Sequence, residues 1–302
     1  MPDSGLTIVV PVYNEAQAIE RSIADLIAIK QNAEFDVEVV LVDDGSEDGT
    51  QEVLLRHADV GFRMIRHTEN RGYGASLKSG LDVAQHRYVA ITDADGTYPN
   101  HRIVEFYEKA VQEDLDMVVG ARTGGAVHIP FIRRPAKWAL NQLANYLTRK
   151  RIPDLNSGLR VMRKDAVREF LGILPDGFSF TTTITLALLT SNRSVSFVPI
   201  DYHHREGKSK IRPIYDTLNF IQLILRTVLY FDPLRVFLPA SFALITVSLM
   251  WGLFSWVVLG LFADASSLLL FLSGIQLGAI GLLADLINRR TAPATATGRP
   301  QA

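Results

Sequence analysis

Residues 6–15 read LTIVVPVYNE, and this stretch decides how the N-terminal part of the chain folds. The apolar, mostly β-branched run at 6–12 is typical of a buried strand. Polar residues follow at 13–15, and apolar residues then recur at helical spacing over 16–30. A strand, a polar loop and a helix in this order predict the first βα unit of a mainly parallel sheet.

The same order recurs along the chain as far as residue 120. Further strands are expected at 37–42, 62–66, 88–92 and 117–120, and helices at 50–57, 75–84 and 101–113. This alternation predicts a Rossmann-like α/β domain. Because no G-x-G-x-x-G or Walker A sequence follows a strand, the pattern argues against a dinucleotide or P-loop site.

Polar loops follow the first, second, third and fourth predicted strands. They read PVYNE (11–15), DDGS (43–46), NRGYG (70–74) and DADG (93–96). In open α/β sheets, ligands bind beyond the carboxyl ends of the strands. We therefore expect a ligand site where these loops meet.

The carboxylates of Asp93 and Asp95 follow a strand, and an Asp-x-Asp of this kind can share one hard cation. Mg²⁺ or Mn²⁺ bound there and completed by diphosphate oxygens would stabilise a leaving nucleoside diphosphate. An isolated Asp-x-Asp is more often a turn or a cap, but three other polar loops at the same rim favour the metal site. Asp43, Asp44 and Ser46 have two readings: one of them caps the next helix, or one carboxylate accepts hydrogen bonds from a nucleobase or ribose.

Composition excludes several classes of protein. The 302 residues carry a formal net charge of −1, which gives no basic field for nucleic acid. The chain has no cysteine, so disulfides, thiolate metal ligands and a catalytic thiol are excluded. Any metal must therefore bind to carboxylates or histidine.

Two long apolar segments near the C-terminus predict a transmembrane hairpin. Residues 236–262 contain no charged side chain, and 268–287 contain only Asp285. A helix of about 20 residues spans the hydrocarbon core. The alternative, two core helices of a soluble protein, is disfavoured because such helices rarely run so long without charge.

Basic residues predict the orientation of this hairpin. Arg235 precedes the first span and Arg289 and Arg290 follow the second, whereas the turn at 263–267 has no Lys or Arg. The positive-inside rule then places both ends in the cytoplasm. Residues 1–5 lack the basic start and apolar core of a signal peptide, so we expect a cytoplasmic catalytic domain.

Seven motifs in order carry a resemblance to a known family. They are VPVYNE (10–15), VDDGS (42–46), NRG (70–72), DAD (93–95), GAR (120–122), SGLR (157–160) and GKSK (207–210). Over roughly residues 6–210, the chain resembles family 2 glycosyltransferases of GT-A fold. Within that family it looks like the branch of polyprenyl-phosphate sugar synthases such as dolichol-phosphate mannose synthase.

The resemblance implies roles for individual residues. The nucleotide pocket would be lined by Pro11, Tyr13, Glu15, Asp43 or Asp44, Gly72, Asp93 and Ala94. Asp93 and Asp95 would hold the metal and, with Arg122, be catalytic. The phosphate groups would be bound by Arg122, Arg133 or Arg134, Ser157, His204 or Arg205, and Lys210. Cations suit this task, because an anionic lipid phosphate must approach an anionic sugar diphosphate.

The implied reaction is inverting transfer of a hexose from a nucleotide sugar to a polyprenyl phosphate, dolichyl or undecaprenyl. No carboxylate stands in 178–189, where many family 2 enzymes that act on hydroxyl acceptors carry a base. An alcohol must lose a proton to a general base, whereas a phosphate oxygen is already ionised near pH 7. This absence favours a lipid phosphate. GDP-mannose, UDP-glucose and UDP-N-acetylhexosamines all remain open as donors.

Two positions depart from the pattern of the branch. Thr97 stands where Gln is frequent, and His204 stands where Arg is usual before G-x-S-K. Two other functions are weighed: transfer to a hydroxyl of a glycolipid or polysaccharide, and a non-catalytic nucleotide-binding membrane scaffold. The chain lacks the Q-x-x-R-W sequence and the additional spans of processive polymerases, and the intact Asp93 and Asp95 argue against a scaffold.

The predicted organisation has four parts. A cytosolic GT-A catalytic domain covers 1–210, interfacial amphipathic helices cover 211–233, the hairpin covers 234–290, and a disordered tail covers 291–302. Gly274 and Gly278 form a small-xxx-small pair that serves packing within the hairpin or a homo-oligomer contact. The expected partners are a nucleotide sugar, a polyprenyl phosphate and membrane lipids, with no nucleic acid.

Overall fold

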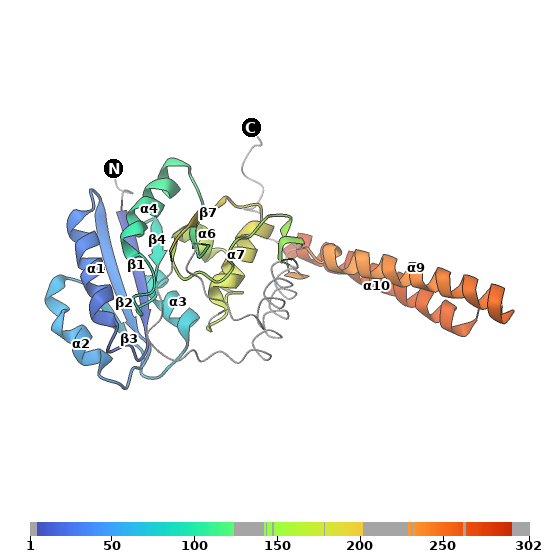
Figure 1. Ribbon diagram of the computed structural model, residues 1–302, viewed down its shortest axis with the longest axis horizontal. Coiled ribbons are helices and arrows are strands. Elements are labelled where there is room, and N and C mark those ends of the chain that lie inside the picture. Colours follow the sequence, from blue (N-terminus) through green and yellow to red (C-terminus); the bar gives the residue numbers. More distant parts are fainter. Residues whose placement is uncertain are drawn as a thin grey trace. The chain divides into compact units, whose positions relative to one another are not determined.

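The computed structural model describes residues 5–123, 142, 144–146, 148–177, 179–201, 229–230, 232–261 and 264–291. The chain forms two compact units, Met1–Ile224 and Leu225–Ala302 (Figure 1). Each unit is described by itself.

The first unit is built on one seven-stranded sheet in the order β3-β2-β1-β4-β6-β5-β7. The strands are β1 Gly5–Val12, β2 Asp36–Asp43, β3 Arg63–Arg66, β4 Tyr88–Ile91, β5 Met117–Ala121, β6 Arg160–Arg163 and β7 Val195–Pro199. Only β6 runs antiparallel to its neighbours, between β4 and β5. The sheet is therefore mainly parallel, as the alternating pattern predicts.

Helices cover both faces of this sheet. They are α1 Ile19–Asn32, α2 Thr50–Arg56, α3 Tyr73–Val83, α4 Ile103–Gln112, α6 Lys164–Arg168 and α7 Phe180–Thr190, with short 3₁₀ turns η1 Ala58–Val60 and η2 Asn100–Arg102. Leu6 and Ile8 of β1 pack in one core cluster with α1 and α4, and Val9 packs in the other with α3 and α7. Burial on both faces explains why β1, apart from Thr7, is apolar rather than alternating.

The five predicted strands and four predicted helices are present, with shifted ends. Helix α1 begins at Ile19 rather than residue 16, because residues 16–18 form a turn in which the N–H groups of Ala18 and Ile19 donate to Glu15 O. Strands β6 and β7 were not predicted. Strand β6 has only four residues, RVMR, and all four are buried. Its two arginines are not typical of a buried strand, so the local sequence does not indicate one.

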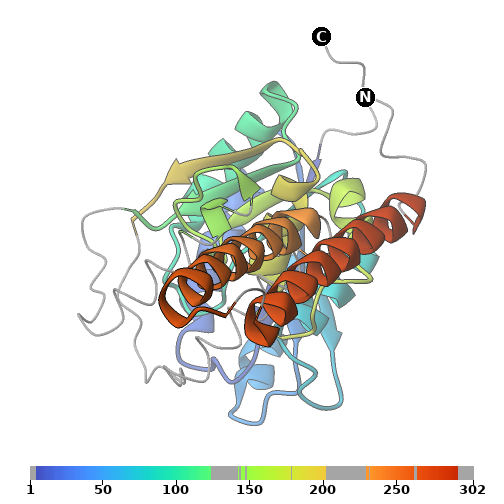
Figure 2. The same ribbon diagram turned by 90° about the vertical axis from the view of Figure 1, so that its right-hand side faces the viewer.

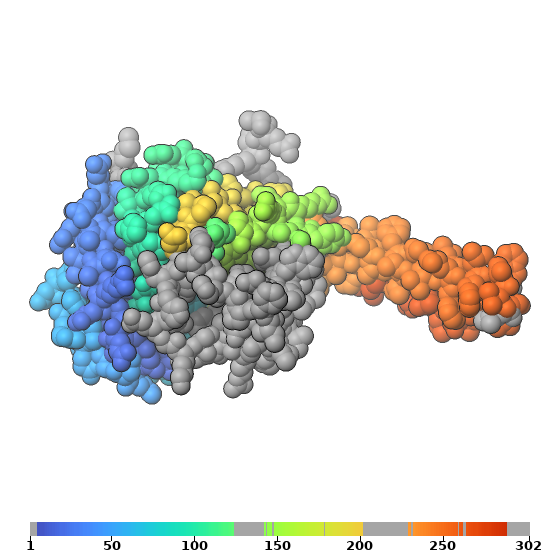
Figure 3. Space-filling model, viewed as in Figure 1, coloured from blue at the N-terminus to red at the C-terminus, as the bar shows by residue number. Residues whose placement is uncertain are grey.

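The second unit contains two long antiparallel helices, α9 Leu234–Leu259 and α10 Ala265–Thr291, which lie side by side (Figure 2). The stretches Leu234–Val258 and Ala265–Asn288 have mean hydropathies of 1.9 and 2.0 and are long enough to cross a membrane. In the space-filling view the pair is elongated (Figure 3). These two helices agree with the two membrane-spanning helices that the sequence predicts.

The ends of these helices differ from the predicted spans. Helix α9 stops at Leu259 rather than reaching 262, because Gly260 adopts a left-handed conformation (φ 71°) that ends the helix. Helix α10 starts at Ala265, where Asp264 Oδ1 accepts the N–H of Ser267 at 2.7 Å as an N-terminal cap. It continues to Thr291, one residue into the predicted tail.

The small residues of α10 pack within the hairpin. A Cβ on Gly274 would lie 2.7 Å from Ile245 Cγ1, and one on Gly278 would lie 3.0 Å from Ser241 Oγ. Ser241 Oγ also donates to Gly274 O at 2.7 Å. Both glycines therefore take part in packing within the hairpin. The domain boundary at 210, residues 211–228 and 231 of the interfacial segment, and residues 292–302 of the tail lie outside the described residues.

Candidate active site

Four polar loops follow four neighbouring parallel strands, β3, β2, β1 and β4, so they meet at one rim of the sheet. Hydrogen bonds join the first two loops. Asn14 N donates to Ser46 Oγ at 3.0 Å, Glu47 N donates to Asn14 Oδ1 at 2.9 Å, and Glu15 N donates to Thr50 Oγ1 at 3.0 Å. Of the predicted nucleotide residues on this loop, Pro11 is buried, Glu15 is half-buried and Tyr13 is exposed.

Asp43 and Asp44 are both 3% exposed but have different surroundings. Asp44 accepts hydrogen bonds from Arg71 N (3.0 Å), Gly72 N (2.8 Å) and His67 Nδ1 (2.6 Å). It therefore shapes the loop that leads into α3. Asp43 Oδ1 accepts the N–H of Ser46 at 3.0 Å, whereas its buried Oδ2 has no hydrogen-bond partner among the described residues.

Neither of these aspartates caps α2. The N-cap position of α2 is Gly49, and Asp48 just before it accepts the N–H of Thr50 through Oδ1 at 3.1 Å. Ser46, expected as an alternative cap, instead accepts the N–H of Asn14. The capping reading of this loop is therefore wrong for Asp43, Asp44 and Ser46.

The Asp-x-Asp pair lies just beyond the end of β4. Asp93 Oδ1 accepts the hydroxyl of Tyr73 at 3.0 Å, and Asp95 Oδ1 accepts the hydroxyl of Thr97 at 2.6 Å and its N–H at 3.1 Å. Thr97, where the branch often has Gln, thus holds the second carboxylate.

The donor chemistry at this pair fits a hard divalent cation. Among the described residues no cluster of three or more His, Asp or Glu could hold a metal. Two carboxylates suffice when substrate phosphate oxygens and water complete the coordination, as is usual for Mg²⁺. Asp93 and Asp95 therefore fit a cation that is bound together with a diphosphate.

Buried polar side chains surround Asp93. Burial, together with the charge of Asp93, raises the pKa of Tyr73 well above its usual value, so the phenol stays protonated and donates. Tyr98 OH accepts the N–H of Gly158 at 2.7 Å. Arg160 is fully buried, and burial lowers its pKa to about 10, so its guanidinium remains charged at neutral pH.

Arg122, expected at the phosphates, forms a two-pronged ion pair with Asp154. Its Nε lies 2.7 Å from Asp154 Oδ2 and its Nη2 lies 2.9 Å from Oδ1, while its backbone N–H also donates to Oδ2 at 3.1 Å. Burial acts to raise the pKa of Asp154, but the bonds from Arg122 outweigh it and the pKa is lowered. The pair holds the Arg122 side chain just beyond β5.

The other predicted phosphate ligands are placed differently or not at all. Ser157 is fully buried and its hydroxyl has no hydrogen-bond partner among the described residues. Arg133, Arg134, His204, Arg205 and Lys210 lie outside the described residues. Helix α7 overlaps the stretch 178–189, which contains no carboxylate. It carries buried threonines, and Thr182 Oγ1 donates to Asn156 Oδ1.

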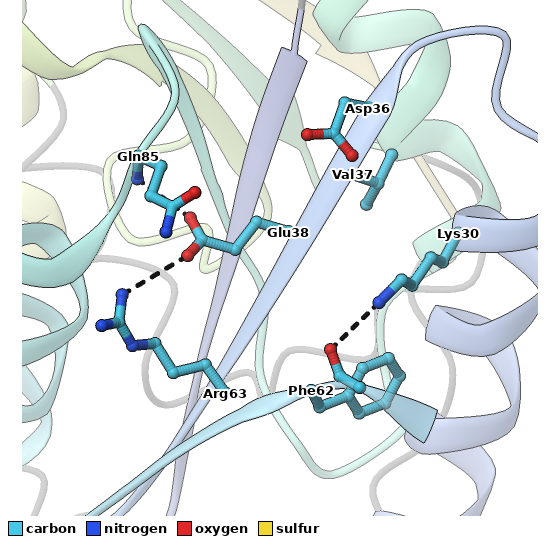
Figure 4. Close-up of a pocket in the computed structure, with 8 residues that line it drawn as sticks. Lys30, Asp36, Val37, Glu38, Phe62, Arg63 and Gln85 are labelled. Carbon is cyan, nitrogen blue, oxygen red and sulfur yellow. Dashed lines mark hydrogen bonds and ion pairs between the residues drawn. The ribbon is translucent and has the colours of Figure 1, made fainter. Parts of the chain in front are cut away.

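A depression of about 460 Å³ lies at the opposite edge of the sheet from the rim loops, where β2 and β3 begin. Its charged groups are already matched within the protein: Arg63 lies 3.6 Å from Glu38, and Lys30 donates to Gly61 O at 3.0 Å (Figure 4). Arg63, Glu38 and Lys30 of this depression therefore have partners within the protein.

The four rim loops lie within a region of the chain that matches a known protein family. Residues 7–171 match the profile of Glycosyl transferase family 2. The chain belongs to this family. Residues 232–289, which include α9 and most of α10, match the GtrB C-terminal hairpin. The protein is therefore a glycosyltransferase with a membrane hairpin.

Several relatives are named for polyprenyl lipids or their phosphates. A dolichyl-phosphate hexose transferase of Haloferax volcanii is 32% identical over 209 residues, which is 69% of this chain and 87% of the relative. A dodecaprenyl-phosphate galacturonate synthase of Rhizobium johnstonii is 26% identical and covers 94% of this chain and 88% of its own. A prophage bactoprenol glucosyl transferase homolog of Escherichia coli is 27% identical and covers 94% of both.

A solved structure supports the fold. Glucosyl-3-phosphoglycerate synthase of Mycobacterium tuberculosis, in complex with Mn²⁺, UDP-glucose and phosphoglyceric acid, superposes with a TM-score of 0.56 at 18% identity. The match covers 74% of this chain and 80% of the synthase. The glycosyltransferase unit thus has the expected GT-A type α/β fold.

Sequence reasoning assigned no role to five residues of this site. They are Tyr73, Tyr98, Asp154, Gly158 and Arg160. Gly158 and Arg160 belong to the SGLR motif at 157–160. The local sequence gives no signal that this segment lies beside Asp93. That proximity depends on β6 pairing with β4, with Arg160 opposite Ile91.

Proposed function

We propose that the protein transfers a hexose from a nucleotide diphosphate sugar to a polyprenyl phosphate, with inversion, at the cytoplasmic face of a membrane. The observation that carries this proposal is a family 2 domain with Asp93 and Asp95 at its rim joined to a GtrB-type hairpin in one chain. Two relatives that span most of the chain or of their own length are named for lipid phosphates, and a third is named for the lipid bactoprenol.

The nucleotide would bind at the rim between the first and third loops. The buried Oδ2 of Asp43 is an acceptor with no hydrogen-bond partner among the described residues, and an N–H of a nucleobase would satisfy it. Arg66 lies 3.6 Å from this oxygen and lines a depression of about 310 Å³ with His67 and Thr68. Of the two aspartates, Asp43 is therefore the better candidate for base recognition.

The diphosphate would lie at Asp93 and Asp95. A bound Mg²⁺ or Mn²⁺ would supply Lewis-acid stabilisation of the negative charge on the departing nucleoside diphosphate. Asp93 and Asp95 would hold it, while Tyr73 and Thr97 orient the two carboxylates. Arg122, oriented by Asp154, would bind a phosphate oxygen.

The chemistry needs no base. An ionised oxygen of the lipid phosphate attacks the anomeric carbon from the face opposite the leaving group. The new carbon–oxygen bond forms as the bond to the diphosphate breaks, and the electron pair of that bond leaves with the nucleoside diphosphate. No proton moves, which agrees with the absence of a carboxylate from 178–189.

The acceptor class can be tested with a matched pair of lipids. Purified full-length protein in detergent is incubated with labelled GDP-mannose, UDP-glucose or UDP-N-acetylglucosamine and either undecaprenyl phosphate or undecaprenol. We expect product only with the phosphate, and an inverted anomeric configuration by NMR. Product with undecaprenol, and none with the phosphate, would contradict the proposal.

The proposed orientation can be tested because the chain has no cysteine. Ser266→Cys places a single thiol at an exposed position in the first turn of α10, and Gln31→Cys places one at an exposed position of α1. In intact cells a membrane-impermeant maleimide should label the first and spare the second. The reverse pattern would show that the catalytic unit faces outward.

A further inference from the structure

The segment at 157–160 passes unusually close to Asp93. A Cβ built on Gly158 would lie 2.8 Å from both carboxylate oxygens of Asp93. Atoms that are not bonded to each other do not approach so closely, so only glycine permits this contact. The backbone of Gly158 therefore forms one wall around the Asp93 carboxylate, and the Tyr73 hydroxyl contacts the same group.

Buried hydrogen bonds hold that wall in place. Arg160 donates from Nε to Ser157 O at 3.2 Å and from Nη2 to the same oxygen. Its Nη1 donates to Thr181 O and Thr185 Oγ1 on α7, both at 3.0 Å. The Gly158 N–H is held by Tyr98 OH. The segment cannot retreat without breaking bonds of a fully buried guanidinium, which is costly.

We propose that Gly158, clamped by Arg160 and Tyr98, is a positioning residue that sets the orientation of the Asp93 carboxylate. The inference rests on the proposed function, in which Asp93 holds a divalent cation with the donor diphosphate. Of the two groups that would collide in a Gly158→Ala variant, the backbone is fixed and the Asp93 carboxylate is the end of a side chain. The carboxylate rotates away, and its contact with Tyr73 is lost.

The test measures cation binding rather than turnover. Full-length protein in detergent is titrated with Mn²⁺, and free Mn²⁺ is followed by electron paramagnetic resonance in the presence of UDP and, separately, GDP. We expect Gly158→Ala to weaken Mn²⁺ binding by about 10- to 100-fold, the usual effect of disturbing a residue that orients a metal ligand. Nucleotide affinity in EDTA should be unchanged.

Gly172→Ala is the matched control, because a Cβ there meets nothing within 4 Å. It should bind Mn²⁺ like the wild type. Tyr98→Phe removes the acceptor of the Gly158 N–H without adding bulk, so it should weaken Mn²⁺ binding in the same direction by a smaller factor. It also keeps the inference testable if Gly158→Ala fails to fold.

The outcomes separate this inference from the proposed function. Wild-type Mn²⁺ affinity in both Gly158→Ala and Tyr98→Phe, with the wild type binding the ion, would overturn the positioning role alone. A wild type that binds no Mn²⁺ with either nucleotide would overturn both the role and the metal assignment. An equal loss of nucleotide affinity in EDTA would show a general disturbance of the rim and would also overturn the positioning role.

Discussion

The glycosyltransferase unit and the hairpin distribute their side chains in opposite ways. In the first unit, Leu6 and Ile8 are 0% exposed and polar groups gather at the rim. In the hairpin, Met250 and Val257 are 68% and 71% exposed, while serines such as Ser248 are buried between the helices. Apolar side chains avoid water in one region and face lipid in the other, where backbone and serine polar groups must be satisfied internally.

Because of this difference, we expect substitutions in the two regions to impair different properties of the protein. In the first unit, function depends on a few carboxylates held by hydrogen bonds, so a single polar substitution should abolish activity without unfolding. In the hairpin, we expect no single polar contact to carry function, whereas charge on the outer face should prevent insertion.

Asp95→Ala should have the largest effect. Loss of one carboxylate of the pair should lower the transfer rate by about 10²- to 10³-fold or more, because electrostatic stabilisation of the leaving group is lost. Membrane insertion and thermal stability should stay normal. Asp82→Ala, on an exposed position of α3, is the control and should keep full activity. Near wild-type transfer by Asp95→Ala would refute the assignment of Asp95.

Val247→Arg compares the two regions directly with Val111→Arg. Both valines are exposed, at 51% and 47%, but Val247 lies near the middle of α9 and Val111 lies on α4. Arginine at a helix centre costs about 3 kcal/mol in membrane insertion. We expect Val247→Arg to deplete the membrane fraction and Val111→Arg to leave it unchanged. Equal behaviour of the two variants would remove the basis of the comparison.

Gly274→Val should loosen the hairpin. Its Cβ would lie 2.7 Å from Ile245 Cγ1 and 3.2 Å from Ser241 O, and overpacking of this kind costs about 1–3 kcal/mol. The melting temperature in detergent should fall, while Mn²⁺ and nucleotide binding by the other unit should persist. An unchanged melting temperature, together with altered oligomeric mass on a sizing column, would favour the oligomer reading of this glycine pair.

Asp154→Asn should have the smallest effect, and it should depend on pH. The pKa of Asp154 is lower in the folded protein, so the ionised carboxyl stabilises the fold above its unfolded pKa, and this contribution is lost as the pH falls through the folded value. The variant should lose about 1.5 kcal/mol of stability at pH 7. The difference from wild type should shrink below about pH 3.9 in thermal melts, and a difference that does not depend on pH would contradict this account.

Much of this architecture could be predicted from local sequence. The run LTIVVPV, the carboxylates at 93 and 95 and the two charge-poor segments each carry a signal within a few residues or turns. Strand β6 carries no such signal, because RVMR gains its burial only by pairing with β4 and β5. The Arg122–Asp154 pair was missed for the same reason, since 32 residues separate its partners.

The sequence by itself determined the class of the protein: a βα-repeating domain with acidic and polar loops at the strand ends, followed by a hairpin apolar enough for lipid. Periodicity and hydropathy are local, so they can be read without contacts. Only the tertiary structure decided that Asp44 accepts the N–H of Gly72 while Asp43 Oδ2 has no hydrogen-bond partner among the described residues, and that Gly158 packs against Asp93. These features depend on distances between strands distant in sequence, which strand order and register determine.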